Sequence, residues 1–175
     1  TETPAGYVQL KEGFSLQDVP ENVRVRMRGG SYPDGCTISW EDLRYLRVLH
    51  TGFDGKTHEG ELVANARIAE DLLEIFAALH EAGYPIEKIR LIDDYGADDD
   101  TSMADNNTSC FCYRVVSGTG RLSRHAYGMA VDINPLYNPY VTSSGVLPAD
   151  GAQYAERGSG NPYFIDENDL CYTLF

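Results

Sequence analysis

A histidine and an aspartate that lie close together in the chain, His125 and Asp132, are the residues best suited to hold a metal ion. An imidazole nitrogen and a carboxylate oxygen are both ordinary ligands of Zn²⁺ in proteins. Gly128 lies between them and allows the backbone to turn or to approach another segment closely. The residue types therefore indicate a zinc site, although a histidine and an aspartate at this spacing also occur without any joint role.

The segment between residues 129 and 134 is expected to form a strand that leads out of a loop bearing His125. Side chains alternate between the two faces of a strand. Ala130, Asp132 and Asn134 would then face a cleft. The apolar side chains of the segment would face the core: Met129, Val131 and Ile133.

Five residues of this stretch also match a known sequence pattern. Ser123, His125, Gly128, Ala130 and Asp132 form Ser-x-His-x-x-Gly-x-Ala-x-Asp. This pattern resembles that of the M15 zinc D-alanyl-D-alanine carboxypeptidases and endopeptidases of bacterial cell walls and phage endolysins. The flanking sequences are similar to one branch of that family. The resemblance extends over roughly residues 35 to 175 and is closest to a VanY-like enzyme, with a core domain of the type found in subfamily C of these peptidases.

The resemblance implies a role for each matching residue. His125 and Asp132 correspond to the first and second zinc ligands. Arg114 corresponds to a cationic residue near the scissile carbonyl, where a guanidinium stabilises the oxyanion formed when water attacks. Ser123 and Asn134 would orient the ligands or bind substrate. For these two residues, local turn capping is an equally good interpretation.

Two further residues, Ser102 and Asp105, are expected to line the cleft from the loop before Arg114. The acidic run at residues 98–100 is more simply interpreted as a solvated loop than as a site for a hard cation such as calcium.

The sequence departs from the family pattern in one important respect. The third zinc ligand of the family is a histidine in a late Glu/Asp-x-x-His segment, whose acidic residue is the general base. No histidine follows His125. We therefore expect this chain to be a truncated peptidase core, with little activity and weak metal binding by itself. Of the earlier histidines, His58 is the only plausible substitute ligand, whereas His80 and His50 are expected to be structural.

The predicted fold is α+β, with a small antiparallel sheet, helices on one side and zinc in an open cleft, as in the Hedgehog and D-Ala-D-Ala peptidase type. Residues 1–35 are expected to be an irregular segment and residues 36–175 the peptidase core. Within residues 1–35, only 23–27 are predicted to form a strand. Helices are predicted at residues 39–49, 62–82 and from 166 onward, with strands at 86–95, 110–116 and 129–134 and a loop at 96–108.

Composition narrows the function further. The net charge of −13 disfavours nucleic acid as a partner. No apolar run is long enough to cross a membrane. The four cysteines allow one or two disulfides if the protein is secreted, or else four buried thiols.

Three functions follow from the sequence. The first is a secreted or cell-wall-associated bacterial metallopeptidase, expected to be a monomer, that hydrolyses peptidoglycan stem peptides at the D-Ala-D-Ala or the L-Ala-D-Glu bond. The second is a non-catalytic module that resembles the Hedgehog signalling domain or binds the cell wall. The third is a globular domain without a metal ion.

Overall fold

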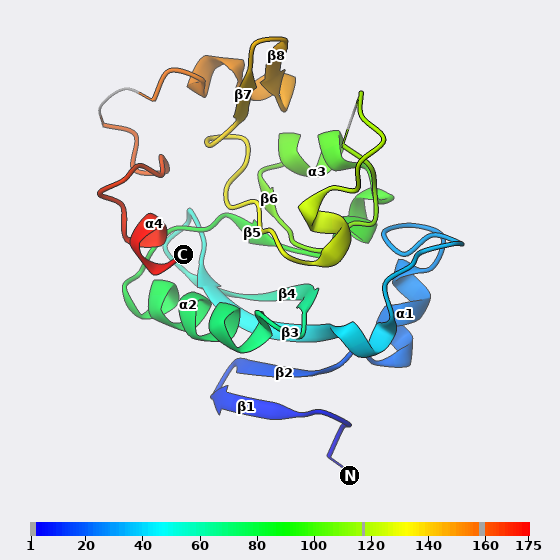
Figure 1. Cartoon of the computed structure of the whole chain (residues 1–175). Helices are drawn as coiled ribbons and strands as arrows, with labels where there is room; N and C mark the ends of the chain where they lie inside the picture. Colours follow the sequence, from blue (N-terminus) through cyan, green and yellow to red (C-terminus); the bar gives the residue numbers. More distant parts are fainter. Residues whose placement is uncertain (1–2, 117, 158–159) are drawn as a thin grey trace.

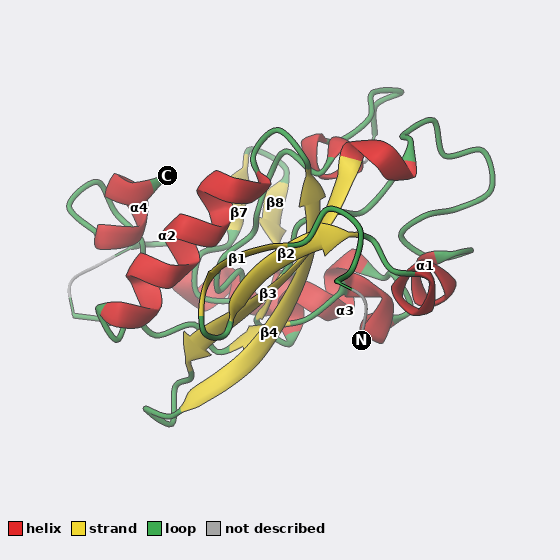
Figure 2. Ribbon diagram, turned by 90° about the horizontal axis from the view of Figure 1, so that it is seen from below, coloured by secondary structure: helices red, strands yellow, loops and turns green. Residues whose placement is uncertain are grey.

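The computed structural model describes residues 3–116, 118–157 and 160–175 (Figure 1). Its centre is an antiparallel sheet in the order β1-β2-β3-β4. The strands are β1 (Val8–Lys11), β2 (Phe14–Asp18), β3 (Leu43–Thr51) and β4 (Thr57–Asn65). The long helix α2 (Ala69–Glu81) packs along β3 and β2, as the view from below shows (Figure 2).

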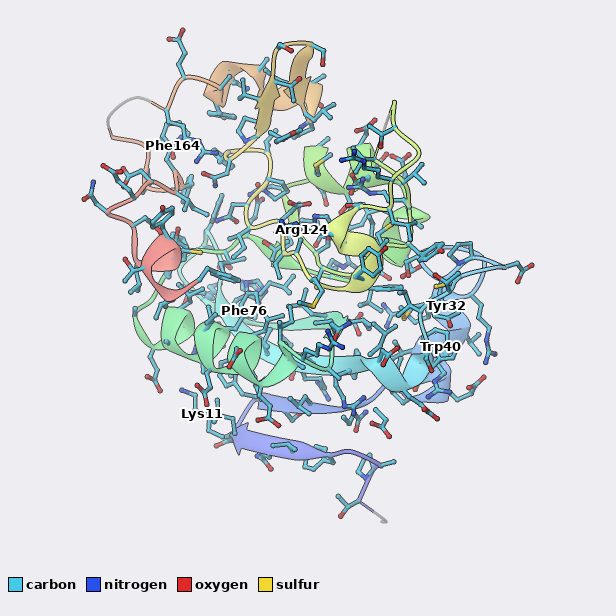
Figure 3. All side chains as sticks on the ribbon, viewed as in Figure 1. Lys11, Tyr32, Trp40, Phe76, Arg124 and Phe164 are labelled. Atoms are coloured by element: carbon cyan, nitrogen blue, oxygen red, sulfur yellow. The ribbon has the colours of Figure 1, made fainter. Side chains whose placement is uncertain are left out.

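Both faces of β4 are buried towards its end, so that alternate residues there enter two different cores. Leu62 and Ala64 pack in a cluster with Phe76 of α2, which Figure 3 labels. Val63 packs in a second cluster that includes Phe111. This second cluster also receives Met27 from the short helix α1 (Glu21–Met27). The segment around Phe111 is thus anchored beside β4, where the ligand segments gather.

The rest of the chain is built from short elements. They are η1 (Trp40–Asp42), β5 (Lys88–Ile89), η2 (Ile92–Tyr95), α3 (Asp99–Ala104), β6 (Asn107–Thr108), η3 (Arg124–Tyr127), β7 (Tyr140–Thr142), β8 (Gly145–Leu147), η4 (Ala149–Tyr154) and α4 (Leu170–Leu174). β5 and β6 pair in parallel, and β7 and β8 form a hairpin. Figure 1 shows β5, β6, α3, β7 and β8 on the β4 side of the sheet, and α4 beside α2.

The α+β prediction, with a small antiparallel sheet and helices, is confirmed. The predicted end of the long helix is also correct. Gly83 has a φ of +67° just after α2, and the N–H of Tyr84 donates to the carbonyl of Leu79. A glycine in the left-handed conformation ends helices in this way because it has no side chain to clash.

The sequence prediction was wrong for the first part of the sheet. The segment before residue 36 is not irregular, since it forms β1, β2 and α1, and residues 23–27 are helical rather than extended. Ser39 is an N-cap as predicted, but η1 stops at Asp42 and β3 follows. The helix predicted from residue 62 begins at Ala69, because residues 62–65 pair with β3. A short apolar run such as Leu62-Val63-Ala64 suits either element until a partner strand is present.

Several later elements also differ from the prediction. Residues 96–108 contain α3 and β6 rather than only a loop, and residues 86–95 form β5 and η2 rather than one strand. The predicted strands at 110–116 and 129–134 make only isolated bridges. The last helix is capped by Asp169 instead of Asp166. Among the helices in the described part of the chain, none has the length and apolar character that a bilayer crossing requires.

Candidate metal centre

The extended segment from Ser109 to Arg114 aligns the two ligand-bearing segments. Ser109 and Asp132 exchange two backbone hydrogen bonds, with N–O distances of 3.2 and 3.0 Å. At the other end, the N–H of Ser123 donates to the carbonyl of Arg114 at 2.9 Å. The same segment therefore holds Asp132 at its start and the turn that contains His125 near its end.

A short turn of helix presents His125. Ser123 is the N-cap of η3, and its hydroxyl accepts a hydrogen bond from the N–H of His125 at 3.2 Å. The imidazole Nδ1 lies 2.7 Å from the carbonyl oxygen of Cys110. Because a carbonyl only accepts, Nδ1 carries the proton, and the lone pair of Nε2 is free for another partner. Metal-binding histidines are oriented by a hydrogen bond of this kind.

The free imidazole nitrogen faces the predicted second ligand. Nε2 of His125 lies 3.3 Å from Oδ2 of Asp132. Two donors in a tetrahedral zinc site, each about 2.1 Å from the metal, lie about 3.4 Å apart. The two side chains are 13% and 33% exposed, so the pair is sheltered but open on one side. The donor types and their separation therefore fit part of a zinc site.

The charge balance of the pair agrees with this geometry. Burial lowers the pKa of His125, but the hydrogen bond and the charge of Asp132 outweigh burial, so the net pKa is raised. A proton and a metal ion compete for the same lone pair on Nε2. The aspartate that favours a proton there would equally favour a cation.

Gly128 attaches the ligand turn to the edge of the sheet. The carbonyl of Gly128 accepts a hydrogen bond from the N–H of Asn65 at 2.9 Å, and nearby the N–H of Phe111 donates to the carbonyl of Val63 at 3.1 Å. Gly128 has a φ of +64°, and a Cβ there would lie 2.7 Å from the nitrogen of Asn65. Gly128 therefore provides both the sharp turn and the close approach that the sequence predicted.

The predicted alternation of residues 129–134 holds for Val131 and Ile133, which pack in the core, but fails at the two ends of the segment. Met129, predicted to face the core, is 40% exposed, whereas Asn134, predicted to face the cleft, is fully buried. The reason is that the segment is not a regular strand, and Asn134 has a φ of +45°. The Asn134 amide accepts from the N–H of Glu87 at 3.1 Å and donates to the carbonyl of Pro85 at 2.9 Å.

Ser102 and Asp105 also have partners inside the protein. Ser102 is buried in α3, and its hydroxyl accepts a hydrogen bond from the amide of Asn107 at 3.0 Å. Asp105 accepts from Lys88 and from the hydroxyl of Tyr95, both at 2.7 Å. These contacts connect α3 to β5, η2 and β6.

Arg114 has a partner that the sequence did not indicate. Its Nη2 lies 2.5 Å from Oδ2 of Asp99, in the first turn of α3. The sequence contains one signal for this helix, because Asp98 caps α3 by accepting from the N–H of Thr101 at 2.8 Å. The acidic run at 98–100 therefore begins a helix and is not a solvated loop. Sequence reasoning missed Asp99 because it interpreted this run as a loop.

Among the described residues, no third donor lies close to the pair. Within residues 3–116, 118–157 and 160–175, no three histidine, cysteine, aspartate or glutamate side chains are grouped closely enough to hold a metal ion. His58 pairs with Asp54 at 2.9 Å instead of approaching His125. His80 lies in the last turn of α2, as predicted, while His50 is buried in β3 instead of ending a helix.

The four cysteines are thiols. Cys110, Cys112 and Cys171 are buried and Cys36 is half-buried, so the buried-thiol alternative is the better description. Burial raises the pKa of Cys110 to about 12. A thiol with this pKa keeps its proton at neutral pH, when no metal ion is bound to it.

A cavity of about 650 Å³ lies beside Asp132. Its walls are mainly apolar, with Val131, Ile133 and Phe175 among them, and Arg157 adds a positive charge. His125 is not among its lining residues. The cavity is large enough for a peptide fragment but opens beside only one member of the pair.

Residues 117–175 match a family model described as D-alanyl-D-alanine carboxypeptidase. The matched segment contains both His125 and Asp132 and covers less than half of the chain. It supports a relationship with the M15 peptidases, which are hydrolases. Comparison with curated proteins and with solved structures found no match.

Proposed function

We propose that this chain forms the core of a zinc metallopeptidase that hydrolyses amide bonds in the stem peptides of bacterial peptidoglycan. The observation that carries the proposal is the 3.3 Å approach of the His125 Nε2 to the Asp132 Oδ2, with Nδ1 held by the carbonyl of Cys110. The carboxypeptidase family match over the same segment supports it. Both D-Ala-D-Ala carboxypeptidase and L-Ala-D-Glu endopeptidase activity agree with this chemistry.

Each side chain has a defined task in this proposal. His125 and Asp132 would hold the zinc ion, and a bound zinc ion supplies Lewis-acid chemistry and lowers the pKa of water. The guanidinium of Arg114 would donate hydrogen bonds to the oxyanion that forms at the scissile carbonyl. Ser123 and Asn134 would position the ligand segments through the hydrogen bonds described above, rather than by touching substrate. Ser102 and Asp105 would likewise act through α3.

The zinc affinity of the chain follows from its ligand number. Four-ligand structural zinc sites bind with about 10–16 kcal/mol, and two ligands would supply roughly half of this, a Kd of about 10⁻⁶ to 10⁻⁴ M. We propose that a third donor and a general base come from outside the described residues. The 175-residue chain should then hydrolyse little or no substrate. The enzyme would act as a monomer outside the cytoplasm.

The proposal is tested first by titrating zinc into the purified chain with isothermal calorimetry. His125→Ala and Asp132→Asn should each weaken binding by at least about tenfold, since each removes one of two ligands. His58→Ala is the matched control, because His58 is exposed and pairs only with Asp54. Equal affinities in all three variants would refute the metal site.

The reaction is tested with the full-length natural protein, loaded with zinc, on a stem pentapeptide. Release of D-alanine identifies a carboxypeptidase, and internal cleavage identifies an endopeptidase. If neither product forms, the peptidase assignment is wrong.

A non-catalytic binding module is the second candidate. The observation that favours it is the lack of a third donor near His125 and Asp132 in the part of the chain that the structure describes. Binding of an intact stem peptide to the zinc-loaded full-length protein, without any hydrolysis, would favour the module over the enzyme.

A further inference from the structure

We propose that Asp99 is a positioning residue that holds the guanidinium of Arg114 beside the His125–Asp132 pair. The inference rests on the proposed function, in which Arg114 stabilises the oxyanion. Asp99 lies outside the segment that matches the carboxypeptidase family.

The contact between the two side chains is short and largely sheltered from water. Oδ2 of Asp99 lies 2.5 Å from Nη2 of Arg114, and the side chains are 24% and 31% exposed. Opposite charges attract more strongly where water is partly excluded. Removing one partner would leave the other charge partly buried and uncompensated. The carboxylate of Asp99 is therefore a strong anchor for the guanidinium.

Backbone hydrogen bonds connect the segment that bears Arg114 to the turn that bears His125: the N–H of Cys112 donates to the carbonyl of His125 at 3.1 Å, and the N–H of Ser123 donates to the carbonyl of Arg114 at 2.9 Å. Burial raises the pKa of Asp99, the charge of Arg114 lowers it, and the charges of Asp132 and His125 act on it in turn. Burial also raises the pKa of the Cys112 thiol. The charge of Asp99 raises this pKa further, and the charge of Arg114 lowers it. The Asp99–Arg114 ion pair thus lies within the electrostatic influence of the candidate ligands His125 and Asp132.

Arg114 retains hydrogen-bonding capacity beyond this contact. Its Nε is buried and has no hydrogen-bond acceptor within the part of the chain that the structure describes. A guanidinium has five N–H donors, and Nη2 makes the closest approach to Asp99. A buried donor without a partner is costly, and a catalytic role is one explanation for it. Asp99 therefore holds the Nη2 end of the guanidinium, and the exposed part of the Arg114 side chain, rather than the buried Nε, would face an oxyanion.

The local structure sets the position of Asp99. Asp98 caps α3, so Asp99 is the first residue of that helix. Its neighbour Asp100 is exposed and makes no ion pair with a described residue. Asp100→Asn is therefore a control that removes the same charge from the adjacent position without touching Arg114.

The experiment compares Asp99→Asn, Asp99→Glu and Asp100→Asn with the wild type. The first readout is the ¹⁵N–¹H resonance of the Arg114 Nε, assigned by its loss in Arg114→Lys. We expect this resonance to be protected from exchange in the wild type and in Asp100→Asn. In Asp99→Asn it should shift and exchange at least about tenfold faster, because the guanidinium is released. In Asp99→Glu it should shift but stay protected, because the carboxylate moves by one methylene.

The second readout separates positioning from metal binding. In the zinc-loaded full-length protein, Asp99→Asn should lower kcat by about 10- to 100-fold, less than complete loss of an oxyanion donor. The Kd for zinc and the KM should change by less than about threefold, because neither ligand is altered. Asp99→Glu should restore part of kcat.

Three outcomes would overturn the proposal. The first is an Arg114 Nε resonance with the same shift and exchange rate in Asp99→Asn as in Asp100→Asn. Another is a loss of zinc affinity that parallels the loss of kcat, which would place the effect at the metal ligands. The third applies if Asp99→Asn does not fold: an Arg114 Nε resonance in Asp99→Glu that is unchanged from the wild type. If the wild type cleaves no stem peptide, the proposed function fails, but the resonance still decides whether Asp99 holds Arg114.

Discussion

Replacing Gly128 with alanine is expected to destabilise the fold and weaken metal binding together. A Cβ at this position would lie 2.7 Å from the nitrogen of Asn65 and 3.1 Å from the carbonyl carbon of Ala64. Both atoms belong to the backbone of β4, which cannot rotate away as a flexible side chain would. The turn must therefore move off the edge of the sheet, and the His125 ring must move with it.

Two costs add up at this position. A non-glycine residue in the left-handed region costs about 1–2 kcal/mol. Forcing an extra methyl group against a packed segment costs about 1–3 kcal/mol. Together they predict a loss of about 2–5 kcal/mol in the free energy of unfolding for Gly128→Ala. Gly96 has a similar φ of +66°, with no atom within 4 Å of a Cβ. Gly96→Ala should therefore cost only about 1–2 kcal/mol.

The assay is urea unfolding followed by circular dichroism, with a zinc titration of each folded variant. Gly128→Ala should lose more stability than Gly96→Ala and should also bind zinc more weakly. Equal losses of stability in the two variants would refute the steric argument. An unchanged zinc affinity in Gly128→Ala would show that the position of His125 does not depend on the β4 contact.

The remaining predictions concern pH, a buried amide and metal linkage. Burial lowers the pKa of His50, against a smaller opposing effect of its hydrogen bond to the Ile86 carbonyl. The unfolded state therefore binds more protons than the folded state. The contribution of His50 to the free energy of unfolding is complete above about pH 6.5 and is lost as the pH falls below that value, by at most about 1.4 kcal/mol per pH unit. Urea midpoints between pH 5 and 7.5 should show a weaker pH dependence in His50→Gln. Asn134→Ala should cost about 2–4 kcal/mol in urea unfolding, because two partly buried backbone groups, the N–H of Glu87 and the carbonyl of Pro85, lose their partners. A loss below about 1 kcal/mol would contradict this account. Zinc at 100 times its Kd should raise the unfolding free energy by about 2.7 kcal/mol, and EDTA should reverse the rise. At the same zinc concentration, His125→Ala should rise by at most about 1.4 kcal/mol, because its Kd is expected to be at least about tenfold higher.

Local sequence signals were sufficient where a feature depends on residues close together in the chain. The apolar stripe of α2 and the glycine that ends it were predicted, because helix periodicity and the left-handed cap are local properties. The same holds for the N-cap Ser39 and for the turn at Gly128. The sequence also singled out the pair His125 and Asp132, which the structure brings within 3.3 Å of each other.

Strands were predicted poorly because their stability comes from partners elsewhere in the chain. Residues 62–65 continue the helical spacing of α2, yet pairing with β3 makes them part of β4. Residues 129–134 alternate like a strand, but they make only one bridge, and Asn134 is turned into the interior by its positive φ. The alternating pattern therefore predicted the buried face at Val131 and Ile133, but neither the pairing nor the orientation of the segment's ends.

By itself, the sequence determined the chemical identity of the proposed ligands and the turn that separates them. Only the tertiary structure decided which groups support them. The carbonyl of Cys110 selects the free nitrogen of His125, and the carboxylate of Asp99 holds Arg114. These contacts join segments that are distant in sequence, and their energies depend on distance and on the exclusion of water, which are properties of the folded chain.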